Sequence, residues 1–203
     1  MLPQYSILII SLLILLGEFF QMKFKYETRR LSLKLLKPSA KYARQALDFY
    51  NRNRAVFERY EALRPKDFYT EGYQKAMLEH DYNLAIHSKC FRFWVFTKND
   101  PARIIGSICF YDIIQPVYGR CETGYKFDER YWHRGLAKEA MELGITLMFY
   151  EVGLHRIEAY AMKDNTASIR LLDSLGFQYE GTCRQYARIR GRWEDHLLYS
   201  LIR

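Results

Sequence analysis

The sequence lacks paired cysteine motifs, internal repeats and low-complexity linkers. Its four cysteines, at positions 90, 109, 121 and 183, form no CxxC pair and show no regular spacing. Zinc sites and disulfide frameworks depend on such spacing, so we expect neither a metal site nor structural disulfides. Cys109 and Cys121 lie in strand-like segments and are predicted to be buried free thiols. Free thiols are typical of a reducing compartment, which favours a cytoplasmic protein.

The composition argues against disorder beyond the chain ends. Apolar residues make up 49% of the 203 residues, with 17 Tyr and 13 Phe. A chain of this length fits one α/β domain with a sizeable core and leaves little room for a second. The formal net charge of +8 favours an acidic partner. Because the excess is spread along the chain, a nucleotide-like cofactor and a nucleic acid are both candidates at this point.

The first 21 residues differ from the rest of the chain. Residues 7–16 (ILIISLLILL) are apolar and uncharged, but a membrane-spanning helix needs about 20 such residues. A signal peptide would need a positive start and a small-residue cleavage site, and the segment has neither. Three interpretations fit: a membrane anchor with its basic flank facing the cytoplasm, an extra apolar helix, or a mis-assigned start with translation from Met22. We favour the third, which makes residues 22–203 the folded domain.

Hydrophobic periodicity predicts strands and helices over the remaining chain. The predicted strands are 29–36, 91–97, 104–114, 120–127, 156–161, 177–189 and 193–202, the predicted helices are 40–51, 70–89, 135–151 and 166–175, and 52–67 is a short helix and loop. The strand–helix–strand unit in the middle requires a parallel crossover, whereas the flanking segments favour antiparallel pairs. We therefore predict an α/β (α+β) fold with a mixed central sheet of about seven strands flanked by helices.

The most informative segment is 125–140 (YKFDERYWHRGLAKEA), where a predicted strand runs through a loop into a helix at Gly135. A helix start presents unpaired backbone N–H groups and the positive end of the helix dipole. Gly135 has no Cβ, so a diphosphate can approach the backbone closely, and Arg134 and Lys138 add positive charge. The segment predicts an anion site, and an ordinary strand–helix turn in which glycine relieves strain is the alternative.

Residues 132–137 (WHRGLA) resemble the turn R/Q-x-x-G-x-G/A with which GNAT acetyltransferases grip the pyrophosphate of coenzyme A. Gly124-Tyr125 followed by YWHRGLA is similar to the RimJ/RimL branch of protein N-terminal acetyltransferases, although that branch often has glycine where this chain has His133. The resemblance covers residues 24–203 and implies the GNAT fold, acetyl-CoA as co-substrate and no metal. It also implies that the following residues bind acetyl-CoA: Tyr125, Lys126, Phe127, Arg130, His133, Arg134, Gly135, Leu136, Ala137 and Asn165.

A second motif lies at 165–177. Asn165, Ser168 and the ending LGF resemble the NxxS and LGF sequences of the RimJ/RimL branch. Helix capping alone would also explain Asn165. The resemblance implies more, namely that Asn165 contacts the pantetheine arm or the active-site backbone and that Ser168 protonates the leaving thiolate. Residues 181–196, with GTCRQY and GRWEDH, are again similar to that branch.

Acetyl transfer requires a polarised thioester carbonyl, a neutral amine and a proton for the leaving thiolate. Backbone N–H groups at the end of the strand 120–127 are suited to polarise the carbonyl. Glu122 lies where GNAT enzymes often place a base, and a surface charge on the strand is the equal alternative. At pH 7 about a tenth of an α-amine is neutral, against a few parts in roughly ten thousand of a lysine side chain. We therefore predict direct attack within a ternary complex by a protein N-terminal α-amine, such as that of a ribosomal protein.

Other functions stay open on the sequence. A small-molecule amine acetyltransferase would often have tyrosine where this chain has Leu172, and a non-catalytic acetyl-CoA-binding module is a further alternative. The aromatic residues lack the spacing of an RNA-binding signature, so we expect no direct nucleic-acid partner. Tyr186 and Trp193 are interpreted as core residues rather than as an amine pocket, and His155 and His196 as structural or surface residues. The sequence leaves the choice between a monomer and a homodimer open, and a membrane contact is expected only if residues 1–21 are translated.

Overall fold

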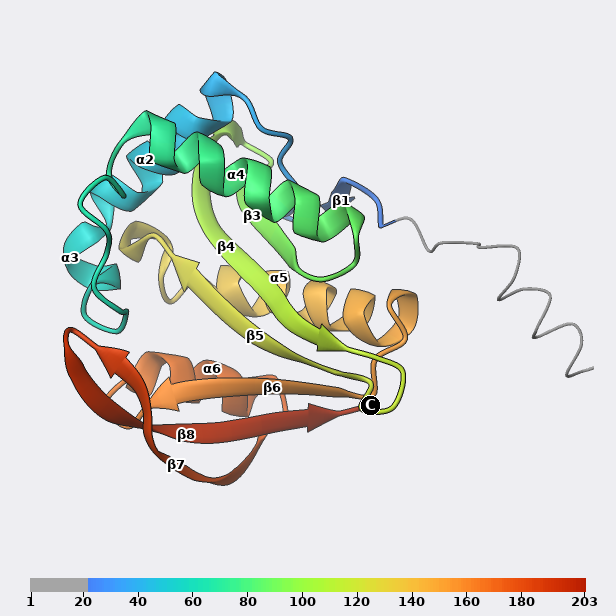
Figure 1. The fold of residues 1–203 in the computed structure, drawn as a ribbon. Coiled ribbons are helices and arrows are strands. Elements are labelled where there is room, and N and C mark those ends of the chain that lie inside the picture. The colour runs from blue at the N-terminus through green and yellow to red at the C-terminus, as the bar shows by residue number, and fades with distance from the viewer. Residues whose placement is uncertain (1–21) are drawn as a thin grey trace, which may run out of the picture.

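The computed structural model describes residues 22–203, and the predictions for residues 1–21 lie outside this part of the chain. Its strands form one sheet in the order β1-β2-β3-β4-β5-β6-β8-β7 (Figure 1). The strands are β1 (Lys25–Glu27), β2 (Leu31–Lys34), β3 (Phe91–Thr97), β4 (Asp100–Ile114), β5 (Arg120–Phe127), β6 (Arg156–Met162), β7 (Gln178–Ile189) and β8 (Arg192–Ile202). Within residues 22–203 no helix is both long enough and apolar enough to cross a bilayer.

The predicted parallel crossover is present between β5 and β6. Every other neighbouring pair in the described sheet is antiparallel. The crossover contains a short 3₁₀ turn, η1 (Glu129–Tyr131), the helix α5 (Leu136–Thr146) and a π-helical turn, η2 (Leu147–Glu151). The mixed sheet predicted from the sequence is therefore confirmed.

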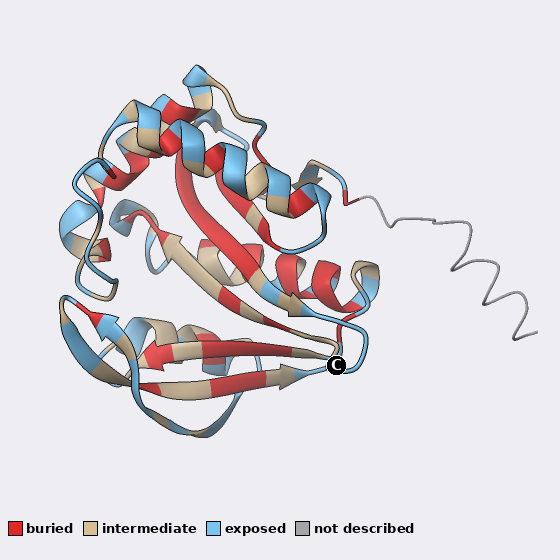
Figure 2. Ribbon diagram, viewed as in Figure 1, coloured by how far each residue is buried: buried red, intermediate tan, exposed pale blue. Residues whose placement is uncertain are grey.

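Helices cover both faces of the sheet (Figure 1). One face carries α2 (Ala40–Arg52), the short α3 (Arg54–Phe57) and α4 (Glu71–Ile86), and the other carries α5 and α6 (Thr166–Ser174). Side-chain caps explain where the two long helices begin, because Ser39 Oγ accepts from the Tyr42 N–H and Thr70 Oγ1 accepts from the Tyr73 N–H, each at 3.2 Å. Figure 2 shows the buried residues gathered along the central strands and on the inward faces of the helices.

Two groups of buried side chains hold these layers together. The larger group packs α5 against β2 to β6, and it includes Cys121, Met141 and Ile157. The smaller group lies under α2 and α3 and is rich in aromatic rings, among them Phe49 and Trp94. Cys109 and Cys121 are both buried free thiols, as predicted.

The observed elements differ from the predicted ones in three places. The strand β1 was missed because three residues that alternate between exposed and half-buried are too few to show a period. The helix predicted over 135–151 is α-helical only to Thr146 and continues as the π-helical turn. The strand β4 begins at Asp100 rather than at the predicted residue 104, and Asp100 already pairs with Thr97 of β3.

Candidate active site

The strands β5 and β6 run side by side only over their first halves. The paired residues are Arg120 to Thr123 on β5 and Arg156 to Ala159 on β6. Beyond Thr123, β5 stays paired with β4, whereas β6 stays paired with β8. Figure 1 shows the two strands diverging toward the side on which α3 lies. The edge of β5 that faces β6 therefore has no strand partner over residues 124–127.

The backbone of this free edge has a defined orientation. The Asp128 N–H donates to the Ile105 carbonyl of β4 at 2.9 Å. Because bonded residues alternate along an antiparallel pair, the N–H groups of Tyr125 and Phe127 point away from β4 and toward the departing β6. The Phe127 carbonyl is also free of β4, because it accepts a hydrogen bond from the indole N–H of Trp132 at 2.8 Å. Two backbone donors thus point where a developing oxyanion would be stabilised.

The loop after β5 enters α5 through two left-handed residues. His133 has φ 57° and Gly135 has φ 70°. The backbone N–H groups of residues 136–138, the start of α5, have no acceptor among the described residues. His133 and Arg134 are exposed on the same turn. Free helix donors, a residue without Cβ and exposed basic side chains are the groups that a diphosphate requires.

An arginine from the turn between β1 and β2 braces this loop. Arg30 Nη1 donates to the Arg134 carbonyl at 2.9 Å, and Arg30 Nε donates to Glu139 Oε2 at 2.6 Å. Glu139 Oε1 also accepts from the Arg30 backbone N–H and from the Thr28 hydroxyl. A Cβ at position 135 would lie 3.5 Å from Arg30 Nη2, so the guanidinium stands beside the helix start. Sequence reasoning missed Arg30 because it lies 104 residues from Arg134 in the chain.

Two hydroxyl groups meet on the α6 side of β5. Tyr125 Oη lies 2.8 Å from Ser168 Oγ and 3.1 Å from the Ser168 carbonyl oxygen. The Ser168 N–H donates to Asn165 Oδ1 at 3.2 Å, so Asn165 caps α6. Burial raises the pKa of Tyr125, which keeps its hydroxyl protonated at neutral pH. The pair therefore holds two exchangeable protons next to the free edge of β5.

Glu122 lies on the other face of β5, the one that α2 and α4 cover, which we call the acceptor face. Its half-buried carboxylate accepts from the Tyr186 hydroxyl at 3.4 Å. Burial, and then the nearby charges of Asp112 and Glu158, raise the pKa of Glu122. Tyr186 stacks on Tyr160 with ring centroids 4.2 Å apart and planes at 9°. A carboxylate with a raised pKa, beside two aromatic rings, suits a general base for an amine.

Residues 30–178 match the acetyltransferase (GNAT) domain, and this match identifies the family. This chain is a GNAT acetyltransferase. Members of this family take the acetyl group from acetyl-CoA, and the donors at the start of α5 fit the diphosphate of that molecule. No group of three or more His, Cys, Asp or Glu side chains suited to a metal ion occurs within residues 22–203.

Individual relatives show which GNAT acetyltransferases this chain is similar to. It is 34% identical over 161 residues to a probable N-acetyltransferase, YjcK, of Bacillus subtilis (strain 168), a match that covers 79% of this chain and 88% of the relative. It is 31% identical over 180 residues to the [ribosomal protein uS5]-alanine N-acetyltransferase of Escherichia coli (strain K12), covering 88% and 91%. The crystal structure of the ribosomal-protein-S5-alanine acetyltransferase from Vibrio fischeri has a TM-score of 0.82 and 31% identity, covering 89% of this chain and 97% of that chain. The chain is therefore similar to RimJ/RimL-type ribosomal-protein acetyltransferases.

Three of the residues predicted to bind acetyl-CoA have other side-chain contacts in this acetyltransferase. The Phe127 ring is buried in the core. Lys126 points to the acceptor face and contacts the Glu61 carboxylate, and burial lowers the pKa of this lysine to about 8. Arg130 Nη2 donates to Asp128 Oδ2 at 2.9 Å. These three side chains therefore have other partners, whereas His133 and Arg134 are exposed at the start of α5.

Two aromatic residues of the β7–β8 hairpin contradict the prediction that they belong to the core. Tyr186 is 40% exposed and Trp193 is 61% exposed. Both lie on the β7–β8 hairpin, the last pair at the edge of the sheet, where alternation does not tell which face is covered. His196 is buried, and its Nδ1 lies 3.1 Å from the Glu194 carbonyl oxygen, as expected for a structural histidine.

The segment between α3 and α4 contacts several distant parts of the chain. Glu61 contacts Lys126 of β5, and its carbonyl accepts from the Arg190 N–H of the β7–β8 hairpin at 3.4 Å. Tyr60 Oη donates to the Asp164 carbonyl, just before α6, at 3.4 Å. The sequence predicted a short helix and loop here but gave no signal for Glu61, because its partners are distant in the chain.

Proposed function

We propose that this GNAT acetyltransferase transfers the acetyl group of acetyl-CoA to the α-amine at the N-terminus of a protein. The observation that carries the proposal is the position of Glu122, half-buried on the acceptor face and one residue before the last β5 residue paired with β6. The similarity to acetyltransferases named for the alanine of a ribosomal protein supports a ribosomal protein as the acceptor.

The donor would be held at its diphosphate by the start of α5. Gly135 and the N–H groups of residues 136–138 would surround the anion, with Arg134 and His133 exposed beside it. His133 adopts a left-handed conformation that costs a residue with a Cβ roughly 1 kcal/mol. The contacts of Arg30 with this loop support the strained turn, because they tie its carbonyl and the following helix to the β1–β2 turn.

The reaction that these groups support is direct attack. The amine nitrogen forms a bond to the acetyl carbonyl carbon while the carbon–sulfur bond breaks. The N–H groups of Tyr125 and Phe127 would stabilise the charge on the carbonyl oxygen. Glu122 would accept the proton that the amine loses, directly or through a water, and the Ser168 hydroxyl would give a proton to the leaving thiolate. Asn165 caps the helix that carries Ser168 and so fixes its position.

The class of amine follows from how little base assistance an α-amine needs. An α-amine has a pKa of about 8, so roughly a tenth of it is neutral at pH 7. A lysine side chain has a pKa of about 10.4 and would need a much stronger base. Glu122 has a raised pKa, but it is a carboxylate and stays a weak base. An N-terminal acceptor is therefore better matched to the site than a lysine.

A thiol-release assay with acetyl-CoA tests the proposal. The acceptors are peptides that begin with Ala, Ser, Thr or Met, an internal-lysine peptide, spermidine and an aminoglycoside. We expect release with at least one N-terminal peptide and a loss of most of that activity in Glu122→Gln, whereas Glu79→Gln, an exposed carboxylate on α4, should behave as wild type. Turnover of lysine or spermidine without any N-terminal peptide would refute the acceptor class. Acetyl-CoA binding without turnover of any acceptor would identify a non-catalytic module.

We also propose that residues 22–203 form the complete catalytic domain. The eight strands that the structure describes form one continuous sheet within these residues. The full chain and the protein of residues 22–203 should therefore release thiol at equal rates with the same peptide. A rate that falls severalfold on removal of residues 1–21 would contradict this.

A further inference from the structure

An open groove of about 670 Å³ lies on the acceptor face, between α4 and the strands β3, β4 and β5. Glu122 forms part of its wall, so the groove reaches the proposed base. Its volume falls in the range of about 300–1,000 Å³ that ligand pockets occupy, which is far more than a simple amine would fill. Its lining includes Met77, Leu84, Tyr111, Asp112, Ile113 and Glu122.

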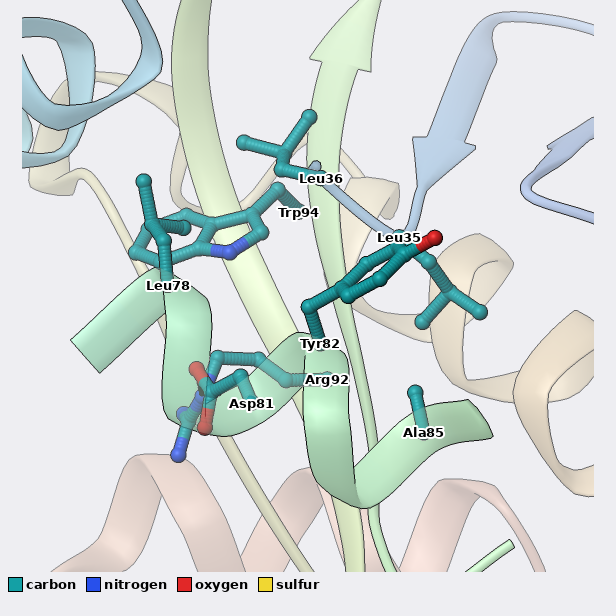
Figure 3. A pocket seen from close by; sticks show the side chains of 8 residues that line it. All are labelled: Leu35, Leu36, Leu78, Asp81, Tyr82, Ala85, Arg92 and Trp94. Carbon is teal, nitrogen blue, oxygen red and sulfur yellow. Dashed lines mark hydrogen bonds and ion pairs between the residues drawn. The ribbon is translucent and has the colours of Figure 1, made fainter. Parts of the chain in front are cut away.

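An ion pair joins α4 to β3 at the groove. Arg92 Nε donates to Asp81 Oδ2 at 2.8 Å, and both side chains are largely buried. Figure 3 shows Asp81 beside the Arg92 guanidinium beneath α4, next to Leu78 and Trp94. The space enclosed under the helix there is only about 10 Å³, too small for more than one water.

The walls offer apolar contacts from two sides. On α4, Met77 and Leu84 are seven residues apart and lie on one face of the helix. On β4, Tyr111 and Ile113 are half-buried and flank Asp112, which has φ 49°. The pairing of β4 with β5 shifts in register beyond Tyr111. Such an irregularity changes the direction in which the following side chains leave the sheet. An extended segment that lies between α4 and β4 would contact apolar side chains along both edges.

The charges of the groove favour an ammonium group at Glu122. Arg92 is neutralised by Asp81, and Arg120 pairs with Glu158 at 2.7 Å. Within residues 22–203, neither Glu122 nor Asp112 has an ion-pair partner, although Lys89 also lines the groove. Two carboxylates on neighbouring strands, neither in a direct ion pair, complement a positively charged amine.

We propose that this groove binds the first residues of the acceptor protein in extended form, with the N-terminal amine at Glu122 and the following side chains between α4 and β4. The inference rests on the proposed function and specifies it further: the acceptor is recognised as a peptide, through apolar contacts beyond its first residue. Affinity for the acceptor then depends on the length of the peptide.

A length series tests the groove with the full-length enzyme. The acceptors are a dipeptide amide, a tetrapeptide and an octapeptide that share one Ala-initiated sequence with apolar residues at alternate positions. We expect the KM for the octapeptide to be at least about tenfold lower than that for the dipeptide, which corresponds to about 1.4 kcal/mol of added contact. Leu84→Arg should raise the KM for the octapeptide toward the dipeptide value. Ile86→Arg, an exposed apolar residue on the same helix that does not line the groove, should keep the wild-type length dependence.

Each outcome is informative about the groove. A KM for acetyl-CoA equal to that of wild type shows that Leu84→Arg is folded, and Ile113→Arg on the facing wall provides a second variant if it is not. Acetylation of peptides with a KM that does not depend on length, or that is unchanged by both variants, would overturn the groove while leaving the proposed function in place. Acetylation of small amines alone would overturn the proposed function itself. A change from dimer to monomer in light scattering on Leu84→Arg would show that the groove is covered by a second copy of the chain, and would also overturn the inference.

Discussion

Asp128→Asn should destabilise this enzyme by about 2 kcal/mol. The Asp128 carboxylate also fixes the loop that leads to α5. Asp128 is only 1% exposed. It accepts from the backbone N–H, the Nε and the Nη2 of Arg130, and from Arg52 Nε at 3.1 Å. Arg52 in turn donates to the Ile104 carbonyl at 2.8 Å, so one carboxylate ties α2 to the start of the loop.

The magnitude follows from the pKa of this carboxyl group. Burial alone would raise the pKa of Asp128, but the hydrogen bonds from Arg130 and Arg52 outweigh it and lower the value from 3.8 to about 2. This lowering of the pKa corresponds to roughly 2 kcal/mol of stability in the ionised form. Because the pKa is lower in the folded state, this contribution is present in full above the unfolded value of 3.8 and is lost as the pH falls toward 2.

Urea unfolding at pH 7 and at pH 3 measures this contribution. The matched control is Asp48→Asn, because Asp48 pairs with the same Arg52 but its side chain is 64% exposed. Exposed pairs contribute about 1 kcal/mol or less, so the control should lose clearly less stability than Asp128→Asn at pH 7. The difference between wild type and Asp128→Asn should shrink at pH 3, where the wild-type carboxylate is losing its advantage. Equal losses in the two variants, or a difference that does not change with pH, would refute the reasoning.

Three further predictions concern the reaction. Tyr125→Phe and Ser168→Ala should each lower kcat about tenfold with little change in the KM for acetyl-CoA. Because the two hydroxyl groups act as a pair, kcat of the double variant should be no lower than that of the less active single variant, and additive losses in steady-state kinetics would contradict this. The amine's own ionisation should give kcat/KM one acid limb at about pH 8, and a second limb, above pH 4.5 because the pKa of Glu122 is raised, should vanish in Glu122→Gln; a second limb that persists in the variant belongs to another group. Gly135→Val should raise the KM for acetyl-CoA at least about tenfold, since φ 70° strains a branched residue, and an unchanged KM would place the diphosphate elsewhere.

The elements with a clear local period were predictable from the sequence. The helix that begins at residue 40 buries Ala46, Phe49 and Tyr50 of its apolar stripe. The turn into α5 was also predictable, because a strand, a glycine and a helix start are adjacent in the chain. The strand β1 could not be predicted, since a three-residue strand is defined by its partner β2 and not by its own pattern.

The contacts that assemble the site are long-range and left no local signal. Arg52 reaches Asp128 across 76 residues, and Glu61 reaches Lys126 across 65 residues. Strand alternation predicts that neighbouring residues face opposite sides of the sheet, but it does not predict which side is covered. Tyr186 was therefore wrongly predicted to be a core residue, whereas its side chain is exposed. Such facts depend on how the layers pack, which is a property of the whole chain.

The alternation of β5 also explains why one short strand can serve both ends of the reaction. Tyr125 faces α6, where its hydroxyl meets Ser168, whereas Glu122 and Lys126 face α2 and α4. The group proposed to protonate the thiolate and the group proposed to deprotonate the amine therefore lie on opposite faces of the sheet, with the free N–H groups of the strand edge between them. An amine that approaches from one face and a thiolate that is protonated on the other need no covalent intermediate on the enzyme. A one-residue shift of β5 would exchange the two faces and place both groups on the wrong sides, so the register of β5 against β4 is itself a requirement of the proposed chemistry.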